Sequence, residues 1–323
     1  MGLLFYDASN GTGAFYSVDD HGNIALLRED DGWSKNWSQI VPTGIPIPPD
    51  DLTPGLKHLT LLFYDPIGGG GELYSHDDAG NMALIQSYPG WSHNWTQILP
   101  GNWGGTRGLL FYSASEGVGQ FYSLDAQGNM ALMKTNTGWS HNWTWIVAGS
   151  WNPPETGLLF YDDLAGVGEF YNVDNQGTIS LLQRHEGWRH SWGHNIIPIG
   201  LLGTTGNQSL LFYDQLAGEG EFYNVDAQGN INLIYHADGW SHTWGQIVSL
   251  FDVSKSIPQG DGESILSRNG LLFYDGLNGV GEFYVLDELG HINLIRQQTG
   301  WRKSWANILE PDMLRPGKSP GAR

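Results

Sequence analysis

The chain has 323 residues, 46 glycines, 15 tryptophans, no cysteine and a formal net charge of −19 at pH 7. The lack of cysteine excludes disulfide scaffolds, thiolate zinc sites and cysteine nucleophiles, and an aromatic content of 13% argues against a disordered chain. The acidic excess argues against nucleic-acid binding, and no apolar run reaches the roughly 18 residues that predict a membrane span.

One sequence pattern recurs six times and explains the glycine and tryptophan content. Each copy opens on Leu-Leu-Phe-Tyr and reaches a Trp-x-x-x-Trp pair 30 positions after its first leucine, as from Leu3 to Trp33. All variation in length follows the second tryptophan, so units of fixed length are joined by connectors that tolerate insertion. The copies fall near residues 2–59, 60–107, 108–156, 157–208, 209–269 and 270–310 of one domain over residues 1–310. The Pro- and Gly-rich tail 311–323 is predicted to be disordered.

The fourth copy predicts four short strands in succession. Leu158–Asp162, Glu169–Asp174 and Ile179–Gln183 are rich in branched and aromatic residues, which favour strands. A tight turn joins the second and third strands, with Gly177 at its left-handed position. Trp188–Ile197 is predicted as the fourth strand, although the Trp-x-x-x-Trp spacing also fits one helical turn.

The first strand of each copy is apolar at adjacent positions, so both of its faces should be buried. Stacked sheets around an axis bury strands in this way. Six copies therefore predict an all-β, six-bladed β-propeller with four antiparallel strands per blade and one repeat per blade. One repeat per blade would let the ring close without strand exchange, but the sequence leaves open how the ring closes. A linear β-solenoid is the alternative fold. The long connectors Val41–Thr60 and Val248–Asn269 are predicted to be surface excursions between blades.

Four recurring motifs connect the repeat to known propellers: Leu-Leu-Phe-Tyr-Asp, Gly-x-Gly-Glu-Phe-Tyr, Asp-x-x-Gly-Asn and Gly-Trp-x-x-x-Trp. Together they resemble the repeats of tachylectin-like and of fungal or bacterial propeller lectins, and also integrin-like (FG-GAP or VCBS) propeller repeats. The resemblance covers nearly the whole chain and implies glycan sites, one per blade or blade interface. Integrin-like repeats usually carry an Asp-x-Asp-x-Asp-Gly calcium loop. The loops here start Asp65-Pro66 and Asp162-Asp163 instead, which argues against calcium binding by that motif.

The tryptophan pairs and nearby polar residues are the candidate carbohydrate-binding residues. A sugar presents apolar C–H faces together with hydroxyl groups, which a tryptophan ring and hydrogen-bonding side chains match. The first tryptophans of the pairs are Trp33, Trp91, Trp139, Trp188, Trp240 and Trp301. The residues midway between the paired tryptophans are Lys35, His93, His141, His190, His242 and Lys303. A recurring acid or amide occurs at Glu72, Gln120, Glu169, Glu221 and Glu282.

Each of these features also has a structural explanation. The tryptophans can wedge neighbouring blades together, and the lysine or histidine position can simply be solvated. The recurring acid can be an edge charge that prevents sheet-to-sheet aggregation.

A multivalent lectin with up to six related non-covalent sites is the predicted function, because linked weak sites gain avidity. Glycans or glycoconjugates are the expected partners, without nucleic acid or membrane insertion, and oligomerisation is left open. Neither a cofactor nor a metal is expected, since histidines on separate blades would rarely converge. A protein-interaction scaffold is the main alternative. A glycan-processing enzyme with a central-channel site is a weaker one. Catalysis needs unlike groups that converge on one atom, whereas the polar residues here recur sixfold, so the chain is predicted not to be an enzyme.

The compartment is not predicted, but two features bear on it. The first residues show no signal-peptide pattern. N-glycosylation acceptor motifs at Asn36, Asn94 and Asn142 overlap the tryptophan pairs, where attached glycans would obstruct packing or binding. We therefore expect a cytosolically made or released protein of bacterial or fungal type.

Overall fold

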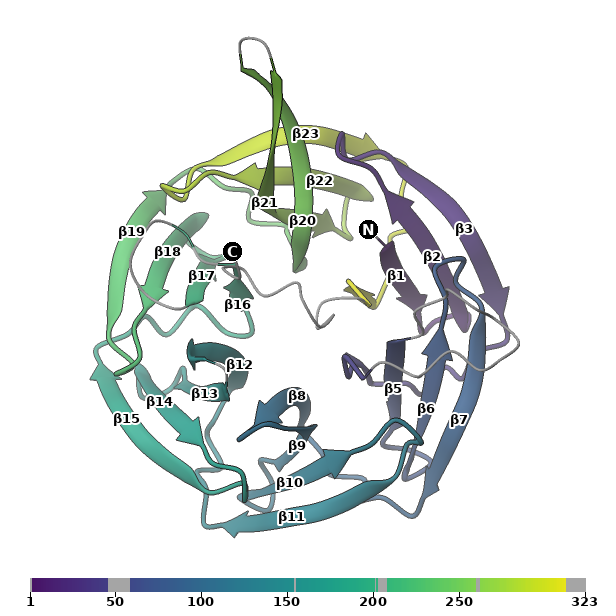
Figure 1. Cartoon of the computed structure of the whole chain (residues 1–323), viewed down its shortest axis with the longest axis vertical. Helices are drawn as coiled ribbons and strands as arrows, with labels where there is room; N and C mark the ends of the chain where they lie inside the picture. The colour runs from purple at the N-terminus through teal and green to yellow at the C-terminus, as the bar shows by residue number, and fades with distance from the viewer. Residues whose placement is uncertain are drawn as a thin grey trace.

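The computed structural model describes residues 2–45, 59–153, 155–200, 202, 208–259 and 262–311, without the side chains of 251–259 and 262–268. The strands form six antiparallel sheets of four strands each, arranged around a central axis (Figure 1). The predicted all-β, six-bladed propeller is therefore confirmed, and the linear solenoid is excluded. No helix in these residues is long and apolar enough to cross a membrane. The tail predicted to be disordered lies outside the described residues, apart from Pro311.

We number each blade by the repeat that supplies its three outer strands, and give its strands from the centre outward. Blade 1 has β24 (Asn307–Leu309), β1 (Gly2–Asp7), β2 (Thr12–Val18) and β3 (Ile24–Asp31), and blade 2 has β4 (Gln39–Pro42), β5 (Leu59–Asp65), β6 (Gly70–His76) and β7 (Met82–Pro89). Blade 3 has β8 (Gln97–Trp103), β9 (Thr106–Ser113), β10 (Val118–Leu124) and β11 (Met130–Thr137), and blade 4 has β12 (Trp145–Asn152), β13 (Glu155–Asp162), β14 (Val167–Val173) and β15 (Ile179–Glu186). Blade 5 has β16 (Ile196–Ile199), β17 (Gln208–Asp214), β18 (Glu219–Val225) and β19 (Ile231–Ala237), and blade 6 has β20 (Gln246–Gln259), β21 (Gly262–Asp275), β22 (Val280–Leu286) and β23 (Ile292–Thr299).

Each sheet combines strands from two repeats. The strand that follows a tryptophan pair crosses to the next blade, where β4 pairs with β5 through Ile40 and Phe63. The ring closes by the same rule, since β24 near the C-terminus pairs with β1 through Ile308 and Phe5. The six repeats give six blades, as predicted, although each blade takes its innermost strand from the preceding repeat. The sequence left open how the ring closes, and the structure shows closure by strand exchange, because the loop that carries each tryptophan pair leads into the innermost strand of the neighbouring blade.

Three of the four strands predicted in the fourth copy are confirmed as β13, β14 and β15. Gly177 occupies the turn between the last two with a φ of 77°, as its left-handed position requires. The fourth prediction, Trp188–Ile197, is wrong for most of its length, because β16 begins only at Ile196. The preceding residues form a loop, which the buried Tyr161 fixes by donating a hydrogen bond to the carbonyl of Arg189.

Aromatic side chains hold adjacent blades together. The first strand of each repeat is buried on both faces, as predicted; in β17 the run Leu210–Tyr213 is fully buried. From this strand, Phe212 packs against both tryptophans of the preceding repeat. Its ring centroid lies 5.4 Å from Trp188 at 90° and 4.6 Å from Trp192. The same pair of contacts recurs at all six blade interfaces, so the tryptophans wedge the blades together.

The recurring glycines make room for this packing. A Cβ at Gly168 would lie 2.2 Å from the ring of Trp188, so only glycine lets the indole lie against the strand. Gly229 has a φ of 80°, and a Cβ there would lie 2.8 Å from Phe170 of the neighbouring blade. Close contacts therefore explain the glycines at these two repeat positions, whereas Gly187 and its equivalents have a positive φ and no atom within 4 Å.

The prediction of surface excursions has a different outcome for each of the two long connectors. Of Val41–Thr60, residues 46–58 lie outside the described residues. Val248–Asn269 is no simple surface excursion, because β20 and β21 pair continuously outward to Gln259 and Gly262, apart from an irregularity after Leu250. The resulting ribbon projects from blade 6 beyond the rim of the ring (Figure 1).

Candidate active site between blades 4 and 5

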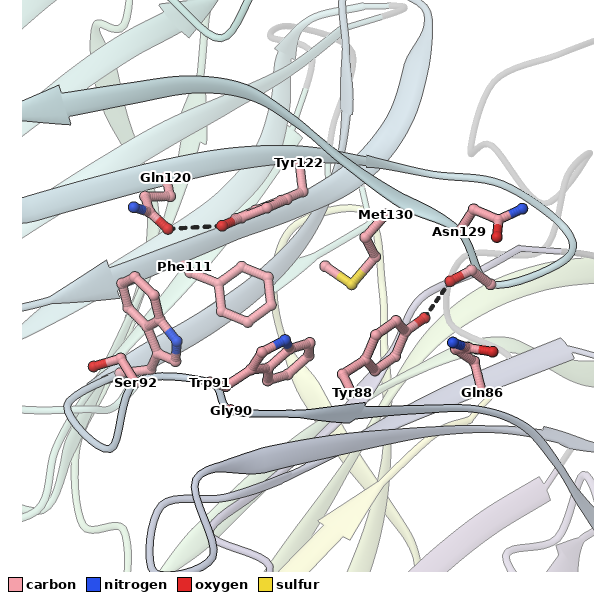
Figure 2. Close-up of a pocket in the computed structure, with 12 residues that line it drawn as sticks. Gln86, Tyr88, Gly90, Trp91, Ser92, Phe111, Gln120, Tyr122, Asn129 and Met130 are labelled. Atoms are coloured by element: carbon pink, nitrogen blue, oxygen red, sulfur yellow. Dashed lines mark hydrogen bonds between the residues drawn. The ribbon is translucent and has the colours of Figure 1, made fainter.

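The interface between blades 2 and 3 contains a cavity of about 540 Å³ that shows how such interfaces are built (Figure 2). Blade 2 contributes Tyr88, whose ring stacks on Trp91 at 5.0 Å and whose hydroxyl donates to the carbonyl of Gly128 on blade 3. Blade 3 contributes Gln120, which accepts a 2.8 Å hydrogen bond from the hydroxyl of Tyr122. The walls are mostly aromatic and amide groups, together with Met130 and Ser92, and carry no charge.

The structure does not bring the three kinds of predicted carbohydrate-binding residue together at one place. Trp91 and Gln120 line the same cavity, although they belong to neighbouring repeats. His93 does not line it. This histidine is exposed, and its Nδ1 lies 2.6 Å from the carbonyl oxygen of Pro66 in the loop after β5. The imidazoles of His141, His190 and His242 contact the equivalent loop carbonyls, and Lys35 and Lys303 are exposed.

The first tryptophans of the pairs are also positioned by packing. Trp188 and Trp240 are buried, whereas Trp33, Trp91, Trp139 and Trp301 are half-buried. Each of them makes a T-shaped contact with a phenylalanine of the next blade, so every one of these indoles takes part in blade packing. Blade packing therefore accounts for the recurring spacing of these residues.

The recurring acid or amide faces the blade interface rather than a sheet edge. Glu72 accepts a 2.6 Å hydrogen bond from the hydroxyl of Tyr74. Burial, followed by the hydrogen bond to Glu72, raises the pKa of Tyr74. The same contact is made at the other four positions, Gln120, Glu169, Glu221 and Glu282.

The interface between blades 4 and 5 differs from this pattern because ionisable groups gather there. Nη2 of Arg189 lies 3.0 Å from Oε1 of Glu221, and Nη1 lies 3.4 Å from Oδ2 of Asp214 and also contacts Glu219. Nε2 of His236 lies 2.8 Å from Oδ1 of Asp238 and 3.7 Å from Oε2 of Glu219. The side chain of Glu221 is only 10% exposed, so part of this cluster is shielded from water.

Two strands and one loop bring these groups together. Glu219 and Glu221 are two positions apart on β18, so their side chains point to the same face of the sheet. His236 lies opposite Glu221 in the pairing of β18 with β19, and Asp238 follows directly after β19. Arg189 reaches them from the tryptophan-bearing loop of the preceding repeat. The cluster is thus assembled across a blade interface.

The surroundings keep the central ion pair charged. Burial alone would raise the pKa of Asp214, but hydrogen bonds from the Ser191 hydroxyl and the Ala217 amide, with Arg189, hold it below the usual range. Burial also works against the charge of Arg189, yet the carboxylates of Glu219 and Glu221 raise its pKa. At neutral pH, Arg189 and Asp214 are therefore a cation and an anion.

Of this cluster only Glu221 was predicted as a site residue, because the prediction followed what the repeats share. Arg189 occupies a position that is serine in four other repeats and arginine only at Arg302. Glu219 replaces a residue that is valine in three repeats, and no other repeat has a histidine at the position of His236. The signal was the departure of the fourth repeat at Arg189 and of the fifth at Glu219 and His236 from the residues of the other repeats.

Comparison with known proteins identifies the fold but no sequence family. No protein-family model matches the chain, and no curated protein matches it as a relative. A solved structure of a Lactobacillus plantarum protein has a TM-score of 0.51 at 9% identity, covering 94% of this chain and 97% of its own. The periplasmic gluconolactonase of Pseudomonas aeruginosa has a TM-score of 0.51 at 13% identity, covering 95% and 98%. A candidate 6-phosphogluconolactonase from Bacteroides uniformis has a TM-score of 0.52 at 12% identity, covering 95% and 98%.

These matches correct the predicted function. At such identities they establish the fold alone, yet the lectin prediction rested on a resemblance to lectin propellers. The two matched propellers whose names state an activity are lactonases, and none of the three is named as a lectin. The predictions of a multivalent lectin and of a chain without enzymatic activity are therefore wrong. A propeller built of similar repeats does not by itself select glycan binding, because function depends on the site.

Proposed function

We propose that this propeller is a hydrolase of sugar derivatives, sugar lactones first among them, with its active site at the interface between blades 4 and 5. One observation carries the proposal. Arg189, Glu219, Glu221, His236 and Asp238 converge at one interface. The interface between blades 6 and 1 also pairs an arginine with an acid, Arg302 with Glu29, but has no histidine at the position of His236. Unlike groups gathered at one point are what catalysis requires and what a sixfold repeat does not produce on its own. The names of the matched lactonases supply the substrate class.

The arrangement suits attack by water on a lactone carbonyl. Nε2 of His236 donates to Asp238 at 2.8 Å, which leaves Nδ1 as the acceptor nitrogen. Nδ1 lies 4.0 Å from Oε1 of Glu221, a separation that suits a water held by both groups. His236 then takes a proton from the attacking water as general base, and Asp238 stabilises the imidazolium that forms.

Arg189 supplies the complementary charge. As water adds to the carbonyl carbon, negative charge develops on the carbonyl oxygen, which a fixed cation stabilises. Glu221 and Asp214 hold Arg189 in place, so its position needs no rearrangement during the reaction. Collapse of the adduct breaks the ring C–O bond, and the proton held by His236 passes to the departing alkoxide. The product is the open-chain hydroxy acid.

Acid release from D-glucono-1,5-lactone, measured by titration at constant pH and corrected for spontaneous hydrolysis, tests the proposal. We expect turnover by the full chain and its loss in His236→Asn. Aryl esters and aryl glycosides complete the panel. Turnover of an ester or glycoside that also requires His236 would move the substrate class and keep the site. No turnover of any of the three, or turnover unaffected by His236→Asn, would overturn the proposal.

A further inference from the structure

We infer that the hairpin of β18 and β19 holds a divalent transition-metal ion, with Glu219, His236 and Asp238 as its protein ligands. One potential ligand atom from each of the three side chains lies within 4.8 Å of the other two. Within the described part of the chain, these residues form the one such group of three. Metal binding here goes beyond the proposed hydrolase activity and would hold without it.

The distances fit a single ion. Ligand atoms at roughly 2.0–2.2 Å from a tetrahedral ion lie about 3.4 Å apart. Nε2 of His236 lies 2.8 Å from Oδ1 of Asp238 and 3.7 Å from Oε2 of Glu219, values on either side of that separation. Small rotations of the three side chains therefore suffice, while the paired strands keep their backbones in place.

The ligand set selects the class of metal. An imidazole nitrogen with two carboxylate oxygens suits Zn²⁺, Mn²⁺ or Fe²⁺, whereas Ca²⁺ and Mg²⁺ prefer sites made of oxygen alone. Three protein ligands also leave a coordination position for water, as in catalytic rather than structural zinc sites. Asp238 and His236 are exposed, so an ion reaches them from solvent.

Local charge favours a cation at this position. Asp214, Glu219 and Glu221 place three carboxylates against the one guanidinium of Arg189, and Asp238 adds a fourth beside His236. Like charges that face each other across a strand pair are destabilising. Oε2 of Glu219, the oxygen that lies 3.7 Å from His236, also contacts Arg189, so the carboxylate must rotate to bind the ion through Oε1 while Oε2 keeps Arg189.

The other blades serve as internal controls for this assignment. Glu221 and His236 face each other across β18 and β19, and Glu219 and Asp238 are the next residues outward on the same face. In blade 6 the same four positions are Glu282, Gln297, Val280 and Thr299. In blade 3 they are Gln120, Thr135, Val118 and Thr137. Among the six repeats only the fifth has a metal-binding side chain at all four positions.

Calorimetric titration of the chelator-stripped full chain with Zn²⁺ and with Mn²⁺ tests the site. We expect one equivalent to bind and the thermal midpoint to rise with metal concentration. His236→Ala and Asp238→Asn should each weaken binding by at least about tenfold. Both residues are exposed, so these variants should keep the fold, which circular dichroism checks. His242→Ala removes an exposed histidine of the same repeat and should change nothing. Absence of binding at millimolar metal, or binding that survives both ligand substitutions, would overturn the inference.

The same samples separate metal binding from hydrolysis. If the ion binds and the protein is a hydrolase, metal-bound water is the nucleophile and a chelator abolishes turnover. Turnover that persists in chelator, together with no calorimetric binding, would remove the metal site and leave His236 as the base. One equivalent of metal on a chain that hydrolyses nothing would support the metal site and remove the proposed function.

Discussion

Arg189 and Glu221 belong to neighbouring repeats, yet Nη2 of the guanidinium lies 3.0 Å from Oε1 of the carboxylate. The contact spans the interface between blades 4 and 5, where the loop that carries Trp188 and Trp192 packs on the first strand of the next repeat. The packing that closes the ring therefore also positions the charges. Stability and activity should respond to different substitutions at this interface.

Arg189→Ser should lower the free energy of unfolding by about 1–3 kcal/mol, because it leaves shielded carboxylates without their charged partner. Serine is the residue of four other repeats at this position, so the fold accommodates it. Arg302→Ser is the matched control. Its pair with Glu29 is more exposed than Arg189 with Glu221, and its loss should cost about 0–1 kcal/mol. Urea unfolding measures both variants, and equal losses would contradict the difference in burial.

Trp188→Ala should destabilise the fold by about 3–5 kcal/mol, because it removes the indole that wedges blade 4 against Phe212 of blade 5. His190→Ala, two residues away and exposed, should change stability by less than about 0.5 kcal/mol. Thermal unfolding of the two variants compares a packing residue with a loop residue. A small effect of Trp188→Ala would mean that the tryptophan pair is not what joins the blades.

Gly168→Ala should cost about 1–3 kcal/mol through overpacking, because the new methyl group would lie 2.2 Å from the ring of Trp188. Gly245→Ala is the control. A methyl group added at that glycine would meet no atom within 4 Å, and its φ is not positive, so alanine should be tolerated there. Denaturant midpoints of the two variants give the comparison. Similar values would show that the strand can shift away from the indole.

The hairpin turns should make stability fall in acid. A hydrogen bond from the Asn129 side chain, with the Asn129 backbone amide, lowers the pKa of Asp125, and related bonds lower the pKa of Asp19, Asp174, Asp226 and Asp287. A carboxyl whose pKa is lower in the folded state contributes stability above its unfolded value of about 3.9. That contribution is lost as the pH falls through the folded pKa.

Thermal midpoints recorded from pH 7 down to pH 2.5 test this account with Asp125→Asn. The variant should be the less stable protein at pH 7, and its difference from the native chain should shrink below about pH 4. Parallel pH curves for the two proteins would mean that Asp125 does not contribute through its charge.

The sequence predicted the ring because the same residue spacing recurs six times. That recurrence determines the number of blades, the buried faces of the strands and turns such as the one at Gly177. It could not predict strand exchange. The repeat has the same residue pattern whether the strand after a tryptophan pair joins its own blade or the next one. Strand pairings such as that of Ile308 with Phe5 show that it joins the next. Apart from Glu221, the charged cluster was missed for the opposite reason. Glu219 and His236 are departures from the repeat, and their proximity depends on the register of β18 with β19.

In the proposed function, hydrolysis occurs at one blade interface rather than at all six. The most direct test compares Glu221→Gln with Glu282→Gln, the same repeat position in blade 6, since both glutamates accept a tyrosine hydrogen bond. For D-glucono-1,5-lactone, Glu221→Gln should lower kcat/KM by about 100-fold or more, and Glu282→Gln should leave it unchanged. Equal losses in the two variants, or full activity in Glu221→Gln, would contradict an active site between blades 4 and 5.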